Sequence, residues 1–269
     1  MKTGVSTASL FMRRNNEDAV PFLAGLGVKT AEVFLTSFSE YESSFGDLLV
    51  SRQNGLHVHS VHDLNTHFEP QLFNACDRVR EDAFALLRKV MINAQKLGAK
   101  YYTFHGIARY KRADRTGEND NFNRFELGFS RILEECKKYG VKLCLENVEW
   151  STYNRPGVFE KISKKLPELH GVLDVKQSRI STYDYRDYLA EMGERIAHVH
   201  VSDFNKDGKI RLPGKGDFDF EELIERLKDV NFNGPLIIEV YKDDYENEQD
   251  LKTSCDFLDE ILYKKGCLD

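Results

Sequence analysis

The sequence contains no long apolar run. A membrane-spanning helix needs about 18 or more consecutive apolar residues, and none of the runs in this 269-residue chain approaches that length. The first residues, MKTGV, also lack the apolar segment of a secretory signal peptide. These two absences predict a cytoplasmic protein that does not insert into a membrane.

The sequence also lacks paired cysteines and an excess of positive charge. Its five cysteines form no CxxC pair, and an odd number in a chain of this size favours reduced, buried thiols over a disulfide framework. The formal net charge of −6 argues against general affinity for phosphate backbones. We therefore expect no nucleic-acid partner.

A short glycine-containing segment occurs three times. Residues 27–29 (GVK), 98–100 (GAK) and 140–142 (GVK) each follow a helical pattern and precede an apolar run. Glycine just after a helix adopts the left-handed conformation that ends it. The repeat predicts one helix-to-strand turn used several times.

Strand and helix patterns alternate along the whole chain, with no low-complexity linker between them. Long helices are expected at 16–26, 71–97 and 246–263. Strands are expected at 2–8, 30–35, 56–62, 100–105, 141–146, 170–174, 195–200 and 235–239. Eight such units in a chain near the typical length of about 250 residues predict an α/β protein, a single (β/α)8 TIM barrel domain over 1–269. A doubly wound sheet is the alternative.

Four predicted strands end on a side chain that can bind metal: Glu146, Asp174, His200 and Glu239. The C-terminal ends of parallel barrel strands meet at one face, so these side chains should converge there. Three carboxylates and one imidazole favour a hard divalent ion, with Mn²⁺ first and Mg²⁺, Co²⁺ or Zn²⁺ as alternatives. The sequence predicts a site for one such ion.

Two connections that follow strands are long. Residues 109–123 are polar and charged, which is typical of an active-site loop or of solvated surface. Residues 203–218 form the second connection, and Asp219 and Glu222 after it have the spacing of a helix capping box. We expect those two acids to be structural.

Several short motifs resemble the xylose-isomerase-like TIM barrels (AP endonuclease family 2), which group sugar phosphate isomerases and epimerases with endonuclease IV. The motifs are SVH at 60–62, TFH at 103–105, LEN at 145–147, LD at 173–174, HVHVSD at 198–203, PGKG at 213–216 and IE at 238–239. The resemblance covers nearly the whole chain. It implies that Glu146, Asp174, His200 and Glu239 hold the metal, and that Glu146 and Glu239 move the substrate proton in the epimerase branch.

The resemblance also implies three substrate-binding residues: His62, His105 and Gln177. Two further candidates come from their positions in the chain: Trp150, just after Glu146, is expected either to stack on the sugar or simply to pack, and Arg211, beside the glycine-rich turn, either to bind an anionic group or to be a solvated loop charge. Gln177 occupies a position where endonuclease IV needs a zinc-binding histidine, and residues 208–211 lack that enzyme's Asp-x-His pair. One of the nuclease's three metal sites is therefore missing. A second metal bound by His62 and His105 and bridged by Glu146 remains open. His198 is interpreted as a packed interior residue.

These features predict a divalent-metal-dependent isomerase or epimerase of a sugar or sugar phosphate, which moves a proton through the enediolate of a metal-bound ketose. The alternatives are an endonuclease IV-like phosphodiesterase acting on abasic DNA, and a lyase, dehydratase or sugar-binding protein on the same barrel. The expected partner is a small sugar. The sequence leaves open the identity of the sugar, the order in which the glutamates act, and whether the chain forms a homo-oligomer.

Overall fold

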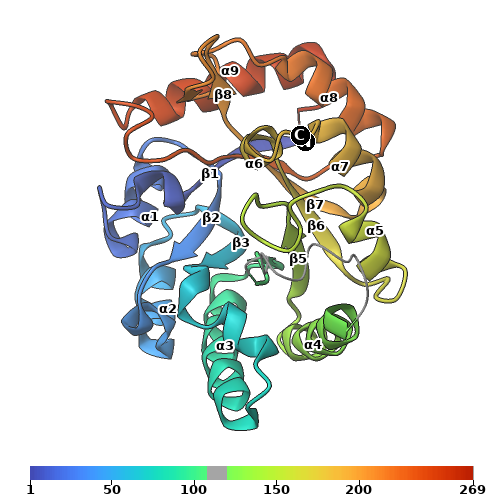
Figure 1. Cartoon of the computed structure of the whole chain (residues 1–269). Helices are drawn as coiled ribbons and strands as arrows, with labels where there is room; N and C mark the ends of the chain where they lie inside the picture. The colour runs from blue at the N-terminus through green and yellow to red at the C-terminus, as the bar shows by residue number, and fades with distance from the viewer. Residues whose placement is uncertain (108–119, 269) are drawn as a thin grey trace.

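The computed structural model describes residues 1–107 and 120–268, and for residues 120–126 it describes the backbone alone. In this structure parallel strands close into a barrel in the order β1-β10-β7-β6-β5-β4-β3-β2. Helices surround the barrel on all sides, as Figure 1 shows along the barrel axis. The predicted (β/α)8 barrel is confirmed, and the closed sheet excludes the doubly wound alternative.

The barrel strands are short and almost entirely buried. All six residues of β2 are buried, as expected for a strand covered by helices on one side and by the barrel interior on the other. The barrel strands are β1 (Lys2–Ser6), β2 (Thr30–Leu35), β3 (His57–Asp63), β4 (Tyr101–Phe104), β5 (Lys142–Glu146), β6 (His170–Asp174), β7 (Ile196–Val201) and β10 (Pro235–Ile238).

The helices pack their apolar faces on the outside of the barrel. On α8, for example, Phe220, Leu223, Ile224 and Leu227 are buried, which is the spacing of one helix face. The α-helices are α1 (Asn16–Gly25), α2 (Ser43–Arg52), α3 (Asp77–Leu97), α4 (Asp120–Lys137), α5 (Val158–Ser163), α6 (Val175–Ile180), α7 (Tyr185–Met192), α8 (Phe220–Asp229) and α9 (Asp250–Lys264). Short 3₁₀ helices lie at Thr7–Leu10, Phe38–Tyr41, Asn65–His67, Glu69–Phe73 and Gly193–Arg195.

The repeated glycine turn has the predicted conformation. Gly27, Gly98 and Gly140 have φ angles of 84°, 76° and 71°, in the left-handed region. The chain ends meet beside the strands that close the barrel, where the Met1 amino group donates to the Cys267 carbonyl oxygen at 2.5 Å. The turn therefore has the conformation that the repeat predicts.

Several predicted boundaries are wrong, and side chains explain two of these errors. The first strand ends at Ser6 instead of residue 8, because the Ser6 hydroxyl accepts from the Ala8 N–H and begins a 3₁₀ turn. The helix predicted at 71–97 is a 3₁₀ helix followed by α3. Asn74 separates them: its backbone is extended and its side chain accepts from the Cys76 N–H at 2.9 Å.

The connection after β7 contains a two-stranded antiparallel ribbon, β8 (Asp203–Phe204) and β9 (Ile210–Arg211). The Asp203 carboxylate organises its return by accepting backbone N–H groups of Phe204, Gly214, Gly216 and Phe218. A Cβ at Gly216 would lie 2.4 Å from the Asp203 Oδ1 atom, so this turn requires glycine. The PGKG motif is thus a structural turn around a buried carboxylate.

Only one of the two hydrogen bonds of a capping box is present at the start of α8. The Asp219 carboxylate accepts from the Glu222 N–H at 2.8 Å, as predicted. The Glu222 carboxylate instead pairs with Arg226 at 2.9 Å, so the reciprocal bond of a capping box is replaced by an ion pair. The active-site loop was predicted at 109–123. Its residues 109–119 lie outside the part of the chain that the structure describes, and its last residues belong to α4, which begins at Asp120.

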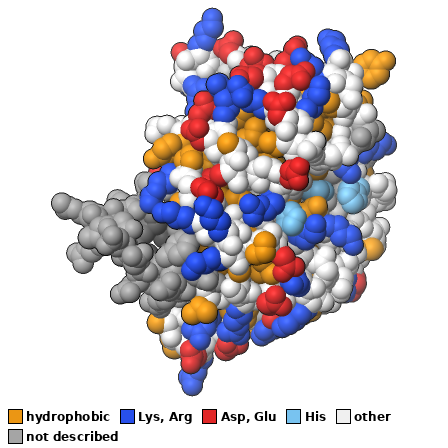
Figure 2. All heavy atoms as spheres, turned by 90° about the vertical axis from the view of Figure 1, so that its right-hand side faces the viewer, with side chains coloured by type: hydrophobic (Ala, Val, Ile, Leu, Met, Phe, Trp, Pro, Cys, Tyr) orange, Lys and Arg blue, Asp and Glu red, His pale blue; other side chains and the backbone are white. Residues whose placement is uncertain are grey.

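Basic and acidic side chains are interspersed on the face shown in Figure 2, with hydrophobic side chains scattered between them. Within residues 1–107 and 120–268, no helix combines the length and apolar character needed to cross a membrane.

Candidate active site

The structure brings the four predicted metal ligands together at the C-terminal end of the barrel. Glu146, Asp174 and His200 lie on β5, β6 and β7, and Glu239 follows β10 by one residue. One ligand atom from each lies within 4.8 Å of the others. Glu239 was expected inside its strand, but its N–H still donates to the Val201 carbonyl oxygen at 3.1 Å, which keeps it in line with β7.

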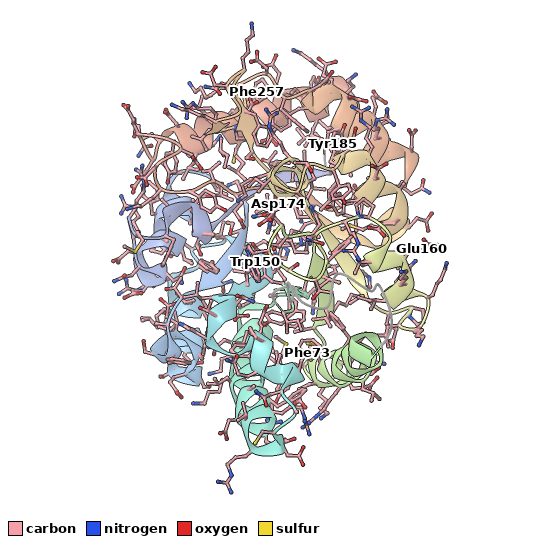
Figure 3. All side chains as sticks on the ribbon, in the orientation of Figure 1. Phe73, Trp150, Glu160, Asp174, Tyr185 and Phe257 are labelled. Carbon is pink, nitrogen blue, oxygen red and sulfur yellow. The ribbon has the colours of Figure 1, made fainter. Side chains whose placement is uncertain are left out.

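His200 lies at the centre of this group, which we call the carboxylate cluster (Glu146, Asp174, His200 and Glu239). Its Nδ1 atom lies 3.0 Å from Glu146 Oε1 and 3.4 Å from Glu239 Oε2. The distance from Nδ1 to Asp174 Oδ2 is 3.9 Å. In Figure 3, Asp174 and Trp150 both lie near the barrel axis in projection, whereas Glu160 lies on the periphery.

The carboxylate cluster has the composition of a site for a divalent cation. Asp174 Oδ2 and Glu239 Oε2 are buried atoms without a hydrogen-bond donor. Unpaired buried carboxylate oxygens are costly, and a cation offsets that cost. Three carboxylates and one imidazole nitrogen fit Mn²⁺, Mg²⁺, Co²⁺ or Zn²⁺.

The pKa values within the cluster reflect burial and close charges. Burial, together with the charges of Glu146 and Glu239, raises the pKa of Asp174 to about 7 against the opposing effect of a nearby ammonium group. Burial alone would raise the pKa of Glu146, but the charge and hydrogen bond of His200 outweigh it and lower that pKa to about 2. Burial would lower the pKa of His200, yet the surrounding carboxylates raise it well above its usual value. An ion bound at Nδ1 would have to displace a proton from that nitrogen.

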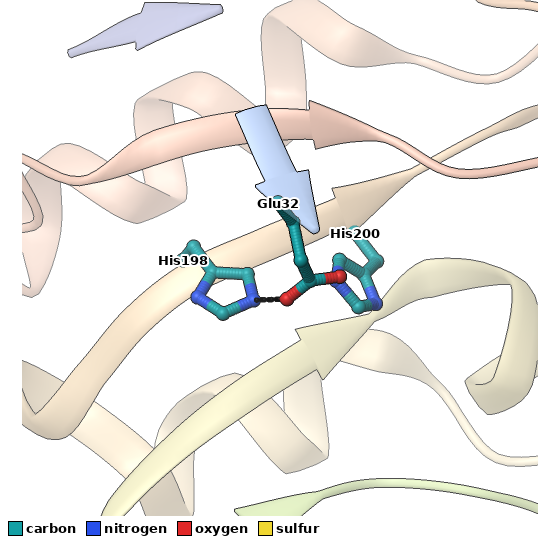
Figure 4. A group of neighbouring side chains, drawn as sticks. All are labelled: Glu32, His198 and His200. Carbon is teal, nitrogen blue, oxygen red and sulfur yellow. Dashed lines mark hydrogen bonds and ion pairs between the residues drawn. The ribbon is translucent and has the colours of Figure 1, made fainter. Parts of the chain in front are cut away.

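A glutamate in the barrel interior, Glu32 on β2, holds the other side of His200. Figure 4 shows the Glu32 carboxylate between the rings of His198 and His200. Its oxygens lie 2.9 Å from His200 Nε2 and 3.2 Å from His198 Nε2. Hydroxyl groups of Ser6, Ser60 and Thr103 also donate to it. A carboxylate that accepts from one ring nitrogen fixes the ring so that the other nitrogen faces a metal.

Sequence analysis missed Glu32. The pattern that could have revealed it is a single acid in the middle of an apolar strand, flanked by Ala31 and Val33. Both faces of such a strand are buried, so a lone carboxylate there requires partners. His198, expected in the interior, is fully buried, and Glu32, His198 and His200 form a second group with metal-binding geometry. Its atoms already contact one another at hydrogen-bonding distance.

The two predicted substrate-binding histidines lie beside Glu146. His105 Nε2 lies 3.3 Å from Glu146 Oε2, and the rings of His62 and His105 are 4.5 Å apart between centroids. These three residues form a further group whose ligand atoms lie within 4.8 Å of one another. The Trp150 ring, 36% exposed, lies 5.3 Å from the His105 ring. The structure therefore places His62, His105 and Trp150 on one side of the cluster.

Gln177 and Arg211 are held by backbone groups. The Gln177 N–H donates to Asp174 Oδ1 at 2.9 Å, and its side-chain oxygen accepts from the Glu149 N–H at 3.2 Å. The Arg211 side chain donates to the Ile210 carbonyl oxygen at 2.9 Å on β9. Gln177 thus borders the cluster, whereas Arg211 belongs to the ribbon after β7.

Two fully buried carboxylates, Glu69 and Asp63, lie near His105, and Glu69 bonds to its backbone. Glu69 Oε2 accepts from the backbone N–H groups of His105 at 3.1 Å and Gly106 at 3.2 Å. The Tyr102 hydroxyl donates to both Glu69 and Asp63. Burial, and for Asp63 also the charge of Glu69, raises the pKa of each carboxyl to about 8.

Comparison with known proteins gives one family. Residues 20–261 match the model of the family described as xylose isomerase-like TIM barrel. The L-ribulose-5-phosphate 3-epimerase UlaE of Shigella flexneri serotype 5b is 26% identical over 228 residues, which span 81% of this chain and 76% of that protein.

Solved structures share the fold. A D-tagatose 3-epimerase-like protein superposes with a TM-score of 0.79 at 21% identity, covering 99% of this chain and 98% of its own. The D-psicose 3-epimerase of Clostridium cellulolyticum H10, solved with D-tagatose, has a TM-score of 0.75 at 17% identity and full coverage of both chains. At these identities the likeness concerns the fold.

Proposed function

This chain belongs to the xylose isomerase-like TIM barrel family, and from that premise we propose that it is a metal-dependent 3-epimerase of a ketose or ketose phosphate. The observation that carries the proposal is the carboxylate cluster, whose four ligand atoms lie within 4.8 Å of one another at the C-terminal end of the barrel. This is the end where TIM barrels carry out their chemistry. The names of the sugar 3-epimerases to which the chain is similar support the same reaction.

In this proposal Glu146, Asp174, His200 and Glu239 hold one divalent ion, Mn²⁺ first. When bound, such an ion draws electron density from a ketose carbonyl and makes the neighbouring C–H group more acidic. Glu32 keeps His200 oriented through Nε2. Asp174 Oδ2 and Glu239 Oε2, which accept no hydrogen bond, are two of the proposed ligand atoms.

Glu146 and Glu239 are the proposed acid and base. One carboxylate removes the proton from C3 of the ketose, and the other returns a proton to the opposite side, which inverts that carbon. Glu146 is held ionised beside His200, with a pKa lowered to about 2, and Glu239 is the most exposed of the four side chains at 13%. His62, His105, Gln177 and Trp150 line the same region and are proposed to bind the sugar; Arg211, on the neighbouring ribbon, is proposed to bind an anionic end of it.

Deuterium incorporation tests the proposal. The protein with Mn²⁺ is incubated in deuterated water with D-tagatose, D-psicose or L-ribulose 5-phosphate, and NMR follows deuterium at C3 and the epimer formed. Turnover should label C3, because a carboxylate exchanges its proton with solvent between the two steps. Glu239→Gln and Glu146→Gln should each reduce labelling by about 10²-fold or more. Labelling at the wild-type rate in both variants at full metal occupancy would exclude the pair.

The group formed by His62, His105 and Glu146 favours one second candidate, a two-metal phosphodiesterase related to endonuclease IV. Two ions sharing a bridging carboxylate can stabilise the attacking and leaving oxygens of a phosphodiester. Gln177 argues against it, because its amide is occupied by the Glu149 N–H and is a poor zinc ligand. Nicking of an abasic duplex with Zn²⁺, at a rate comparable to sugar turnover, would favour this second function.

A further inference from the structure

A fully buried lysine contacts the carboxylate cluster. Lys176, the second residue of α6, is 1% exposed. Its Nζ atom lies 3.3 Å from Glu239 Oε1 and 3.8 Å from Asp174 Oδ2. Lysine is almost never fully buried without a partner for its charge. The lysine and the two carboxylates therefore act as one electrostatic unit.

An aromatic ring encloses the ammonium group on another side. The Lys176 Nζ atom lies 4.3 Å from the centroid of the Tyr241 ring, within the range of cation–π attraction. The ring and the carboxylates of Asp174 and Glu239 together fix the position of the ammonium. A lysine held in this way behaves as a fixed point charge at the cluster.

This charge has two opposite effects. A divalent ion would leave one negative charge on the three cluster carboxylates, and the Lys176 ammonium would balance it. The ammonium also repels any ion that shares Asp174 and Glu239 with it, because like charges a few ångströms apart in a buried site interact strongly. It further donates to Glu239 Oε1, which leaves Oε2 as the oxygen that accepts no hydrogen bond and lies 3.4 Å from His200 Nδ1.

We propose that Lys176 is a further active-site residue: a built-in monovalent cation that weakens divalent metal binding and keeps Glu239 oriented through Oε1 for proton transfer. The inference rests on the proposed function, because it requires a divalent ion at the cluster. Without the ammonium, Glu239 is free to bind an ion through both oxygens. The ion would then be held more tightly, and the glutamate would lose its freedom to carry a proton.

The experiment compares three variants with the wild type. Lys176→Met removes both the charge and the hydrogen-bond donor, and Lys176→Gln removes the charge but keeps a donor. Lys142→Met is the matched control, because Lys142 begins β5 at the opposite end of the barrel and its Nζ also lies near a tyrosine ring, 5.7 Å from the Tyr101 centroid. Calorimetry on the metal-free proteins gives the dissociation constant of Mn²⁺. Melting with and without Mn²⁺ gives the metal-induced rise in Tm.

Lys176→Met should bind Mn²⁺ about tenfold or more tightly than the wild type, show a larger metal-induced rise in Tm, and label C3 of the ketose more slowly. Lys176→Gln should also bind Mn²⁺ more tightly while retaining more of the labelling rate. Lys142→Met should match the wild type in every measurement. A residue with a merely structural role would not tighten metal binding while slowing the reaction.

Two results would overturn the inference in distinguishable ways. Equal or weaker Mn²⁺ binding by folded Lys176→Met, with normal binding by the wild type, would reject the role of Lys176 and leave the proposed function standing. If the wild type bound no divalent ion, both the role of Lys176 and the proposed metal-dependent function would be rejected. Should Lys176→Met fail to fold, Lys176→Gln provides the same comparison, because both variants remove the charge.

Discussion

The buried pair Asp63 and Glu69 should make the stability of this protein depend on pH, and the double variant Asp63→Asn/Glu69→Gln should remove most of that dependence. Both carboxyls have pKa values raised to about 8 in the folded chain, against usual values of 3.8 and 4.5. The protonated carboxyl therefore contributes stability that is complete below about pH 4 and is lost as the pH rises through about 8. Stability should fall with pH across the neutral range.

The magnitude follows from proton linkage. Between the unfolded and folded pKa values, each proton held only by the folded chain changes the free energy of unfolding by about 1.4 kcal/mol per pH unit. Two adjacent carboxylates repel, so we expect the pair to retain one proton. The free energy of unfolding should then drop by about 2–3 kcal/mol between pH 6 and pH 8.

Asparagine at position 63 keeps the shape of the side chain and removes its charge. The remaining acid, Glu69, has its pKa raised by its own burial, against the lowering effects of His62, the Tyr102 hydroxyl and Asn65. Glu69→Gln is therefore combined with Asp63→Asn, so that neither buried acid can hold a proton. Asp63 Oδ2 has no hydrogen-bond partner, so the substituted amide breaks no bond at that atom.

The assay is urea unfolding of the metal-free protein, in a chelator, at half-unit steps from pH 6 to pH 9. Subtracting the curve of the double variant from the wild-type curve cancels the titrations that the two proteins share. Tyr102→Phe is the control: its hydroxyl lowers the pKa of both acids, so its loss should extend the slope to higher pH. A wild-type slope in the double variant would show that neither Asp63 nor Glu69 holds a proton in the folded chain at neutral pH, and would refute the reasoning.

Two further predictions concern the metal and can be checked on the same preparations. Glu32→Gln should weaken Mn²⁺ binding by about 10–100-fold in calorimetry, because a neutral amide polarises His200 less than a carboxylate does; an unchanged dissociation constant would show that Glu32 only fills the barrel interior. Chelation should lower the Tm of the wild type, because an ion bound only by the folded state adds stability, and elemental analysis of Asp174→Asn and His200→Ala should find less than the wild-type metal content. Full metal content in both variants would contradict the cluster as the binding site.

The fold was predictable because its determinants are local and repeated. The glycine turns at Gly27, Gly98 and Gly140 each end a helix just before an apolar strand. This alternation of helices and strands is sufficient to indicate a barrel. The errors fall where one side chain bonds a nearby backbone group. Ser6 and Asn74 each redirect the chain through a single hydrogen bond, which apolar periodicity does not register.

The four cluster residues were predictable for a different reason: the C-terminal ends of parallel strands all lie at the same face of a barrel. Glu32 was not, because its role depends on pairing between strands. The register of β2 against β3 shifts between Ala31 and Glu32, which pairs Glu32 with Ser60 rather than with His59. A local pattern contains no information on such a shift. Lys176 lies on a helical turn after β6, where a lysine is ordinarily solvated, and only the packing reveals that it is buried.

Charges of opposite sign alternate through the site, and this alternation explains why its members act together. The Glu32 carboxylate contacts the His200 ring, that ring contacts Glu146 and Glu239, and Glu239 contacts the Lys176 ammonium. Each group is buried, so each depends on its neighbours to offset the cost of desolvation. Removing one charge leaves the next one uncompensated, and the effects of two substitutions along this chain should not add. The charge balance of the site therefore depends on the whole alternating set, which joins Glu32 in the barrel interior to the carboxylate cluster at the C-terminal end of the barrel.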